Sequence, residues 1–247
     1  MADAPMINVS VDGSVALLTL DRQERRNALN TEQCGNISRA VTEAVADGAR
    51  AIVLTGAGTS FCSGADFGEV YGAGFRDALY GMLHDVAEAP VPVIAAINGP
   101  AIGAGLQLSI ACDLRIADSS AVFGLPTAKL GLAVDPWTIR RLALIAGEGA
   151  ARTLLLACST IEAELAQARG LVDRLGTLED ALGWAKEIAG LAPLTLNYYK
   201  QALNHVGVSD LADPELLAAF ERCWESEDLD EGRRARNEKR TPNFQGR

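Results

Sequence analysis

Two short apolar segments, each closed by a glycine-containing turn and followed by a helical pattern, constrain the fold of this chain most. Residues 51–55 end at the turn 56–58, and residues 91–97 end at the turn 98–100. A continuous apolar segment of this length indicates a buried strand, and strands that alternate with helices indicate βα units. We therefore predict an α/β fold in which the strand-rich units come first.

The remaining patterns complete the expected order of elements. Residues 7–11 and 15–20 alternate apolar and polar side chains around Asp12-Gly13, which indicates a half-buried hairpin. Thr31 can cap a helix that runs to about residue 46. Further along we predict helices at 75–88 and 103–112, short strands at 114–117 and 121–123, and mainly helices from 136 onward, interrupted at 171–175.

Composition excludes several classes of protein. A chain of 247 residues, 49% of them hydrophobic and without a linker, can bury one core without disulfides or metals. We expect one domain, with a core over 1–190 and a helical extension over 191–247. The formal net charge of −10 opposes binding to nucleic acid. No leader-like segment occupies residues 1–10 and no apolar stretch reaches about 18 residues, so we expect a cytoplasmic protein without a membrane span.

Cysteines and histidines carry no metal-binding pattern. The five cysteines are scattered and lack the CxxC spacing that gathers thiolates around zinc, so reduced thiols, mostly in the core, are expected. His84 and His205 have no partner motif, and structural roles are expected for both. A basic cluster follows the acidic stretch 225–231 and predicts a solvated helix face; it comprises Arg233, Arg234, Arg236, Lys239, Arg240 and Arg247.

Two glycine-bearing segments, 61–66 and 98–105, lie where a predicted strand meets a predicted helix. Helix N-termini expose unpaired amides, and small residues let an oxygen approach them closely, so two converging amides could stabilise an oxyanion. For each segment alone, tight packing explains the glycines equally well. Neither segment has the spacing of a dinucleotide-binding or phosphate-binding loop.

The order of these motifs along the chain resembles that of the enoyl-CoA hydratase/isomerase (crotonase) superfamily, and within it an actinobacterial, mycobacterial-type subgroup. The resemblance covers essentially the whole chain. It rests on residues 20–22, 26–30, 64–66, 98–105, 111–113, 123–131 and 238–246.

The resemblance implies a spiral of ββα units with a C-terminal helical region that assembles trimers or dimers of trimers. It implies that a CoA thioester binds as substrate or ligand, with no further cofactor and no metal, and that the amides of Ala65 and Ala104 hold the thioester carbonyl. The residues expected along CoA are Arg26, Ala28, Ala65, Asp66 and Phe67, with Lys239 approaching it, often from a neighbouring subunit.

Two departures from the family pattern bear on function. Where hydratases of this family carry two glutamates, this chain has Gln107 and Thr127. Hydration needs an acid and a base, and neither an amide nor a hydroxyl serves as one near neutral pH. The leading hypothesis is therefore an acyl-CoA or enoyl-CoA binding protein of fatty-acid metabolism without hydratase activity, with a protein of lipid synthesis as a possible partner.

An enzyme remains the alternative hypothesis, because Asp135 stands where related dehalogenases carry a nucleophilic aspartate. Those relatives also have a tryptophan at the position of Thr127 and a histidine at that of Tyr80, and this chain has neither. The other interpretation of Asp135 is a cap for the helix that begins at Pro136.

Overall fold

The computed structural model describes residues 6–70, 72–204, 218, 222 and 225–247. A six-stranded sheet forms its centre, in the order β1-β2-β3-β4-β6-β9. β1 and β2 form the predicted antiparallel hairpin, and the other neighbours in this sheet pair in parallel. The strands are β1 (Ile7–Asp12), β2 (Val15–Leu20), β3 (Ala51–Gly56), β4 (Val93–Ile97), β6 (Leu114–Ala117) and β9 (Arg174–Leu175).

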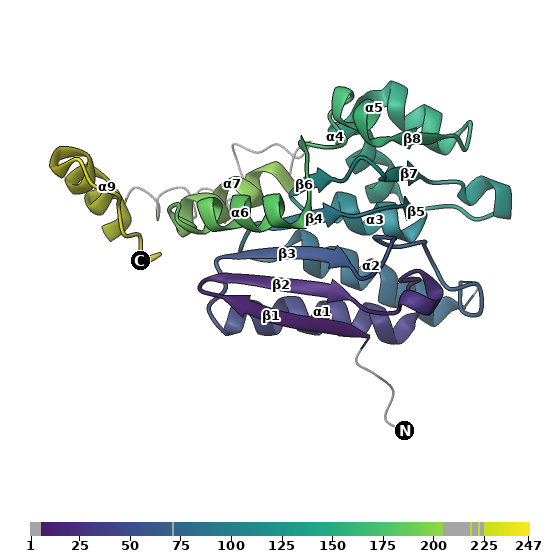
Figure 1. Ribbon diagram of the computed structural model, residues 1–247, viewed down its shortest axis with the longest axis horizontal. Helices are drawn as coiled ribbons and strands as arrows, with labels where there is room; N and C mark the ends of the chain where they lie inside the picture. The colour runs from purple at the N-terminus through teal and green to yellow at the C-terminus, as the bar shows by residue number, and fades with distance from the viewer. Residues whose placement is uncertain (1–5, 71, 205–217, 219–221, 223–224) are drawn as a thin grey trace.

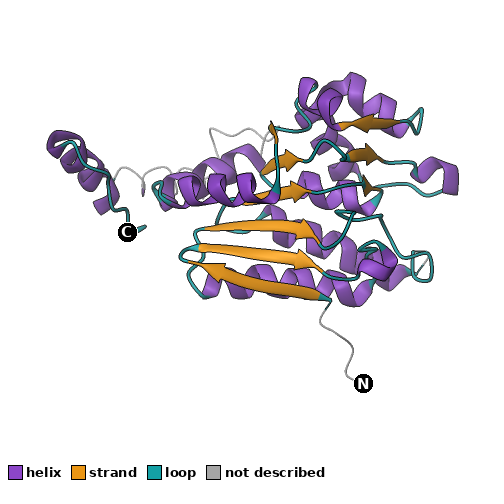
Figure 2. Ribbon diagram, viewed as in Figure 1, coloured by secondary structure: helices purple, strands orange, loops and turns teal. Residues whose placement is uncertain are grey.

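Helices cover both faces of this sheet (Figure 2). Along β3, Ala51 and Val53 pack in the core beneath α6 (Leu178–Ala189), whereas Ile52 and Leu54 belong to the larger core on the opposite side. Successive side chains of a strand point to opposite faces, so a strand covered on both sides must be apolar throughout. This is why residues 51–55 form a continuous apolar segment. The larger core lies against α1 (Thr31–Ala46), α2 (Ala73–Ala87) and α3 (Ala104–Ala111).

A second, three-stranded sheet has the order β5-β7-β8 and lies beside the first (Figure 1). Its strands are β5 (Ala101–Ile102), β7 (Val122–Gly124) and β8 (Thr160–Glu162), and the helices near it are α4 (Pro136–Leu155) and α5 (Ala163–Ala168). Two successive ββα units follow each other along the chain, β4-β5-α3 and β6-β7-α4. Each unit contributes one strand to each sheet. All eight residues of α3 are buried between these layers.

Of the C-terminal helices, α7 (Pro193–Asn204) lies beside α6, whereas α9 (Glu227–Glu238) stands apart from the sheet (Figure 1). Lys200 anchors α7 (Pro193–Asn204) to the core, because its Nζ lies 2.7 Å from Asp113 Oδ2 and donates to the carbonyls of Val86 and Val91. The last described helix is α9 (Glu227–Glu238). The proposed division near residue 190 stays a prediction.

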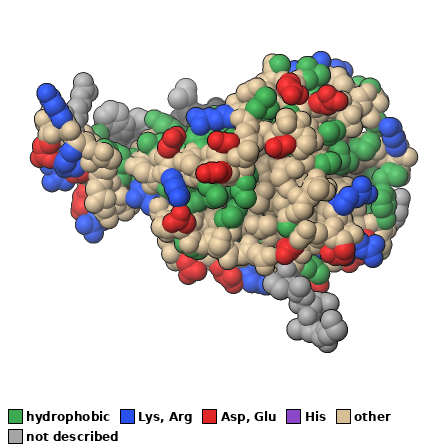
Figure 3. Space-filling view, in the orientation of Figure 1, with side chains coloured by type: hydrophobic (Ala, Val, Ile, Leu, Met, Phe, Trp, Pro, Cys, Tyr) green, Lys and Arg blue, Asp and Glu red, His purple; other side chains and the backbone are tan. Residues whose placement is uncertain are grey.

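Carboxylates of α9 form ion pairs with basic residues on the helix and just after it. Figure 3 shows acidic and basic side chains intermixed at this end of the molecule. Arg240 contacts Glu231 and Glu238, and Arg234 lies 3.2 Å from Glu231. Arg240, through its hydrogen bond, holds the pKa of the Glu231 carboxyl at about 2. Two residues of the basic cluster, Arg234 and Arg240, are thus paired with carboxylates of α9.

Two sequence predictions need correction. Asn30, not Thr31, caps α1: its side chain accepts the amide of Gln33 at 2.8 Å, while the Thr31 hydroxyl donates to Glu69. β5 and β8 were not expected, because strands of two or three residues are too short to show periodicity. The predicted interruption of the helices at residues 171–175 is confirmed, and it contains the strand β9 at Arg174 and Leu175.

Two further expectations concern thiols and membranes. Cys34, Cys62 and Cys112 are buried free thiols, and Cys158 is partly buried; burial raises the pKa of the first three to about 12. His205 and Cys223 lie outside the described residues. No helix in the described part of the chain is long and apolar enough to cross a membrane.

Replacing Lys200 by methionine is expected to lower the free energy of unfolding by about 3–5 kcal/mol, because Asp113 would keep a buried charge without its partner. The matched control is Lys186→Met, which removes an exposed pair with Asp12 and should leave the stability nearly unchanged, because water screens the pair. Urea unfolding of the two variants measures both changes; equal losses would contradict the anchoring role of Lys200.

Candidate functional site

The two glycine-bearing segments lie against each other. Cys62 and Ala101 form a parallel bridge, in which the Cys62 amide donates to Pro100 and the Cys62 carbonyl accepts from Ile102. A Cβ at Gly105 would lie 2.2 Å from the Cys62 carbonyl oxygen, a distance that real side chains do not tolerate. Glycine is therefore required at position 105, because backbone meets backbone there.

Gly64 and Gly103 shape the turns at this contact. Their φ angles are +113° and +56°, conformations that residues with a Cβ rarely adopt. A Cβ at Gly64 would lie 2.9 Å from the Ile102 carbonyl oxygen and 3.8 Å from the Ala104 nitrogen. The turn that carries Ala65 is therefore next to the N-terminus of α3, which begins with Ala104.

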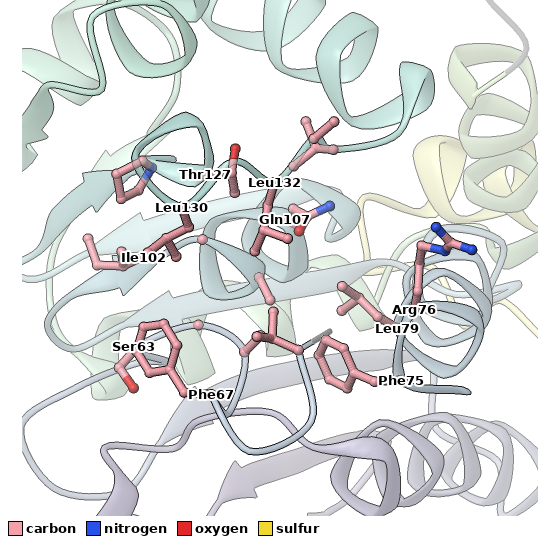
Figure 4. A pocket seen from close by; sticks show the side chains of 18 of the residues that line it. Ser63, Phe67, Phe75, Arg76, Leu79, Ile102, Gln107, Thr127, Leu130 and Leu132 are labelled. Atoms are coloured by element: carbon pink, nitrogen blue, oxygen red, sulfur yellow. The ribbon is translucent and has the colours of Figure 1, made fainter. Parts of the chain in front are cut away.

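A cavity of about 470 Å³ opens beside this contact (Figure 4). Its walls come from the Gly64 turn, α2, the N-terminal half of α3, and the segment from Pro126 through the short 3-10 helix Thr127–Leu130 to Val134. The side chains that face it are mostly apolar. Its polar or charged lining residues are Ser63, Arg76, Tyr80, Gln107 and Thr127.

The predicted oxyanion amides, those of Ala65 and Ala104, both belong to cavity-lining residues. Among the backbone hydrogen bonds of the described residues, neither amide donates one. The N-terminus of α3 adds the partial positive charge of a helix end. Two unpaired amides on adjacent turns can stabilise a polarised carbonyl oxygen, although their roles toward a ligand stay predictions.

The residues predicted along CoA lie together at one side of the cavity. Leu29 and Ala65 form a parallel bridge, which places Arg26 and Ala28 beside the Gly64 turn. The amide of Gly68 and, less strongly, the guanidinium of Arg22 at 2.8 Å hold the pKa of the Asp66 carboxyl below its usual value. Phe67 lines the cavity and is 69% exposed. Lys239 follows α9 and does not line this cavity.

The two positions where the resemblance predicts glutamates for a hydratase, and the candidate Asp135, lie as follows. Gln107 and Thr127 both line the cavity, and the Gln107 side chain is buried with Nε2 2.9 Å from Thr138 Oγ1. Asp135 caps α4, where its carboxylate accepts the amides of Trp137 and Thr138 and the Thr138 hydroxyl. Asp135 does not line the cavity, so this geometry favours the capping interpretation over a nucleophile.

Sequence reasoning did not assign Arg76 and Tyr80 to the site. Both lie on the face of α2 that also brings Phe75 and Leu79 to the cavity, and the recurrence of these residues at helical spacing was the available signal. Burial, followed by the charge of Asp135, raises the pKa of the Tyr80 phenol. His84 is exposed on the next turn of α2 and does not line the cavity.

Comparisons with known proteins match the chain over nearly its full length. The family model described as enoyl-CoA hydratase/isomerase matches residues 10–247. A Mycobacterium tuberculosis protein named probable enoyl-CoA hydratase echA6 is 46% identical over 98% of this chain and 100% of its own. A short-chain-enoyl-CoA hydratase of Clostridium acetobutylicum is 34% identical over 93% of each chain.

Solved structures give the same result for the fold. The enoyl-CoA hydratase of Bacillus anthracis superposes with a TM-score of 0.90 at 31% identity, over 98% of this chain and 100% of its own. A superposition that covers 98% of this chain includes both sheets and the helices around them.

Replacing Gly105 by alanine is expected to lower the free energy of unfolding by about 1–3 kcal/mol, because the new methyl group meets the Cys62 carbonyl. Gly81→Ala on α2 is the matched control; a Cβ there meets nothing within 4 Å, so it should be neutral or stabilise by about 0.4–1 kcal/mol. Thermal unfolding compares the two, and a neutral Gly105→Ala would show that the backbones need not meet so closely.

Proposed function

The chain belongs to the enoyl-CoA hydratase/isomerase family and has the crotonase fold, and from this premise we propose that it binds a fatty acyl-CoA or enoyl-CoA thioester without hydrating it. One observation carries the proposal. Among the described residues that line the cavity, none is an aspartate or a glutamate. The cavity has backbone amides that can bind a thioester carbonyl. Its described lining residues provide no carboxylate that could take a proton from water.

Hydration of a double bond requires a base that takes a proton from water and an acid that protonates the neighbouring carbon. Positioned groups of this kind each contribute about 10²–10⁴-fold to the rate. The polar or charged lining residues here are a serine, an arginine, a glutamine, a threonine, and a tyrosine whose phenol has a raised pKa. These groups can hold a ligand but cannot take its proton near neutral pH.

The CoA part of the ligand is proposed to lie outside the cavity, along Arg26, Ala28, Asp66 and Phe67. The exposed ring of Phe67 and the neighbouring Gly64 turn support this path. Lys239 would reach CoA only from another copy of the chain, in a trimer or a dimer of trimers. We place the protein in the cytoplasm, where a partner of lipid synthesis would receive the acyl chain.

A second candidate is an enzyme of this family that uses Asp135 on an unidentified acyl-CoA. The observation in its favour is that Asp135 lies close enough to Tyr80, a cavity residue, to raise the pKa of its phenol. This candidate requires the capping hydrogen bonds of Asp135 to break, which the first candidate does not.

The deciding experiment measures hydration of crotonyl-CoA by loss of its enone absorbance, beside calorimetric titration with a long-chain acyl-CoA. We expect binding without turnover. Turnover of about 1–10³ s⁻¹, the range of ordinary enzymes, would contradict the proposal.

Removing one proposed amide tests how the thioester is held. Ala104→Pro deletes the amide at the first position of α3, where proline is compatible with a helix, and should weaken acyl-CoA binding about two- to tenfold. Ala104→Ser keeps the amide and serves as the matched control. Equal affinities of the two variants would place the thioester elsewhere.

A further inference from the structure

Arg76 is the one charged side chain among the described residues that line the cavity. The other polar side chains of the lining, those of Ser63, Tyr80, Gln107 and Thr127, are neutral near pH 7. The described lining therefore carries a single positive charge, although the formal net charge of the whole chain is −10. A cavity whose charge is opposite in sign to that of the molecule around it favours an anionic group in its ligand.

The Arg76 guanidinium has no partner of opposite charge in the described part of the chain. The ion pairs found there involve Arg22, Arg115, Arg152, Lys186, Lys200, Arg234, Arg240 and Arg247. Arg76 is exposed, whereas its neighbours Phe75 and Leu79 are buried in the cavity wall. A charged head between an apolar wall and water can bind an anion without being buried itself.

Tyr80 supplies a second donor at the same place. It lies one turn after Arg76 on α2, a rise of about 6 Å, and side chains at this spacing share one face of a helix. The charge of Arg76 acts on the Tyr80 phenol and lowers its pKa, although burial raises that pKa more strongly. Both side chains line the cavity, so a guanidinium and a phenolic hydroxyl can donate to one ligand group.

Two carboxylates are close to Arg76 or Tyr80, and neither neutralises the guanidinium. Asp135 acts on the Tyr80 phenol, but its carboxylate accepts the amides of Trp137 and Thr138 and does not line the cavity. Asp77 directly follows Arg76, and adjacent residues of a helix do not face each other. The positive charge at the cavity is therefore left for a ligand.

Arg76 lies far from the side of the cavity where the CoA part of a ligand is proposed to lie. Figure 4 shows Ser63 and Phe67 on one side and Arg76 on the opposite side. The proposed thioester amides, those of Ala65 and Ala104, belong to the Gly64 turn and to the α3 N-terminus beside it. An acyl chain that begins at these amides and extends through the cavity would bring its far end, rather than the CoA phosphates, to Arg76.

We propose that Arg76, with Tyr80 beside it, determines specificity for a carboxylate at the far end of the acyl chain. The cavity then prefers CoA thioesters of dicarboxylic acids over saturated acyl-CoAs with the same number of carbons. This inference rests on the proposed function and names its ligand class. A guanidinium and a carboxylate form strong charge-assisted hydrogen bonds, whereas a carboxylate without a partner in a mostly apolar cavity would lose hydration without compensation.

The test pairs glutaryl-, adipoyl- and suberoyl-CoA with pentanoyl-, hexanoyl- and octanoyl-CoA in calorimetric titrations, because the distance from the thioester to Arg76 selects the chain length. At the preferred length the dicarboxylic thioester should bind about two- to tenfold more tightly than its pair, the effect of a charge-assisted hydrogen bond near water. Arg76→Gln removes the charge and should abolish or reverse this preference. Arg76→Lys keeps the charge and should retain part of it.

Arg140→Gln is the matched control. Arg140 is another exposed arginine that forms no ion pair with a described residue, and it does not line the cavity, so its replacement should keep the preference. Higher ionic strength should weaken the preference of the unmodified protein, because salt screens a contact close to water.

If the unmodified protein binds both members of every pair equally, the inference fails while the proposed function stands. If it binds none of these thioesters and no long-chain acyl-CoA, both fail. A preference that survives in Arg76→Gln would assign the selectivity to another residue and overturn the role of Arg76. An equal loss of affinity in Arg76→Gln for both members of a pair and for CoA itself would place the guanidinium on the CoA phosphates, which also overturns it.

Discussion

The contact between the Cys62–Gly64 backbone and the start of α3 is the constraint on which the site depends. It requires glycine at position 105, because a methyl group there would lie 2.2 Å from the Cys62 carbonyl. It also holds the bridge between Cys62 and Ala101, which continues the small sheet. The same close approach sets the amides of Ala65 and Ala104 beside one cavity, so the packing of the core and the geometry of the site have one origin.

The lining of the resulting cavity supports the proposal that the protein binds a thioester without transferring protons. Its polar lining includes the phenol of Tyr80, whose pKa is raised, and the side-chain amide of Gln107, while the carboxylate of Asp135 is engaged at the N-terminus of α4. A helix cap satisfies amides that would otherwise be unpaired, which gives Asp135 a structural reason to be present. The hydroxyl of Thr138 donates to the same carboxylate and accepts from the side-chain amide of Gln107.

Much of the fold could be predicted from local pattern. The hairpin around Asp12-Gly13, the buried strand at 51–55 and the helix after Gly103 were all visible, because each depends on periodicity or on turn residues close in sequence. The strands β5 and β8 were missed because they are short and exist through pairing with β7. The predicted cap of α1, Thr31, was wrong by one residue. Asn30 caps the helix, and the Thr31 hydroxyl instead donates to Glu69, a residue far along the chain.

The sequence by itself determined the family resemblance, the α/β class, and the presence of Gln107 and Thr127 where the resemblance predicts glutamates for a hydratase. These follow from residue identity and order alone. Only the tertiary structure decided that Arg76 and Tyr80 line the cavity, that the Asp135 carboxylate caps α4, and that the Gln107 side chain donates to Thr138. Each of these depends on atoms from separate elements meeting within hydrogen-bond distance, which no local pattern records.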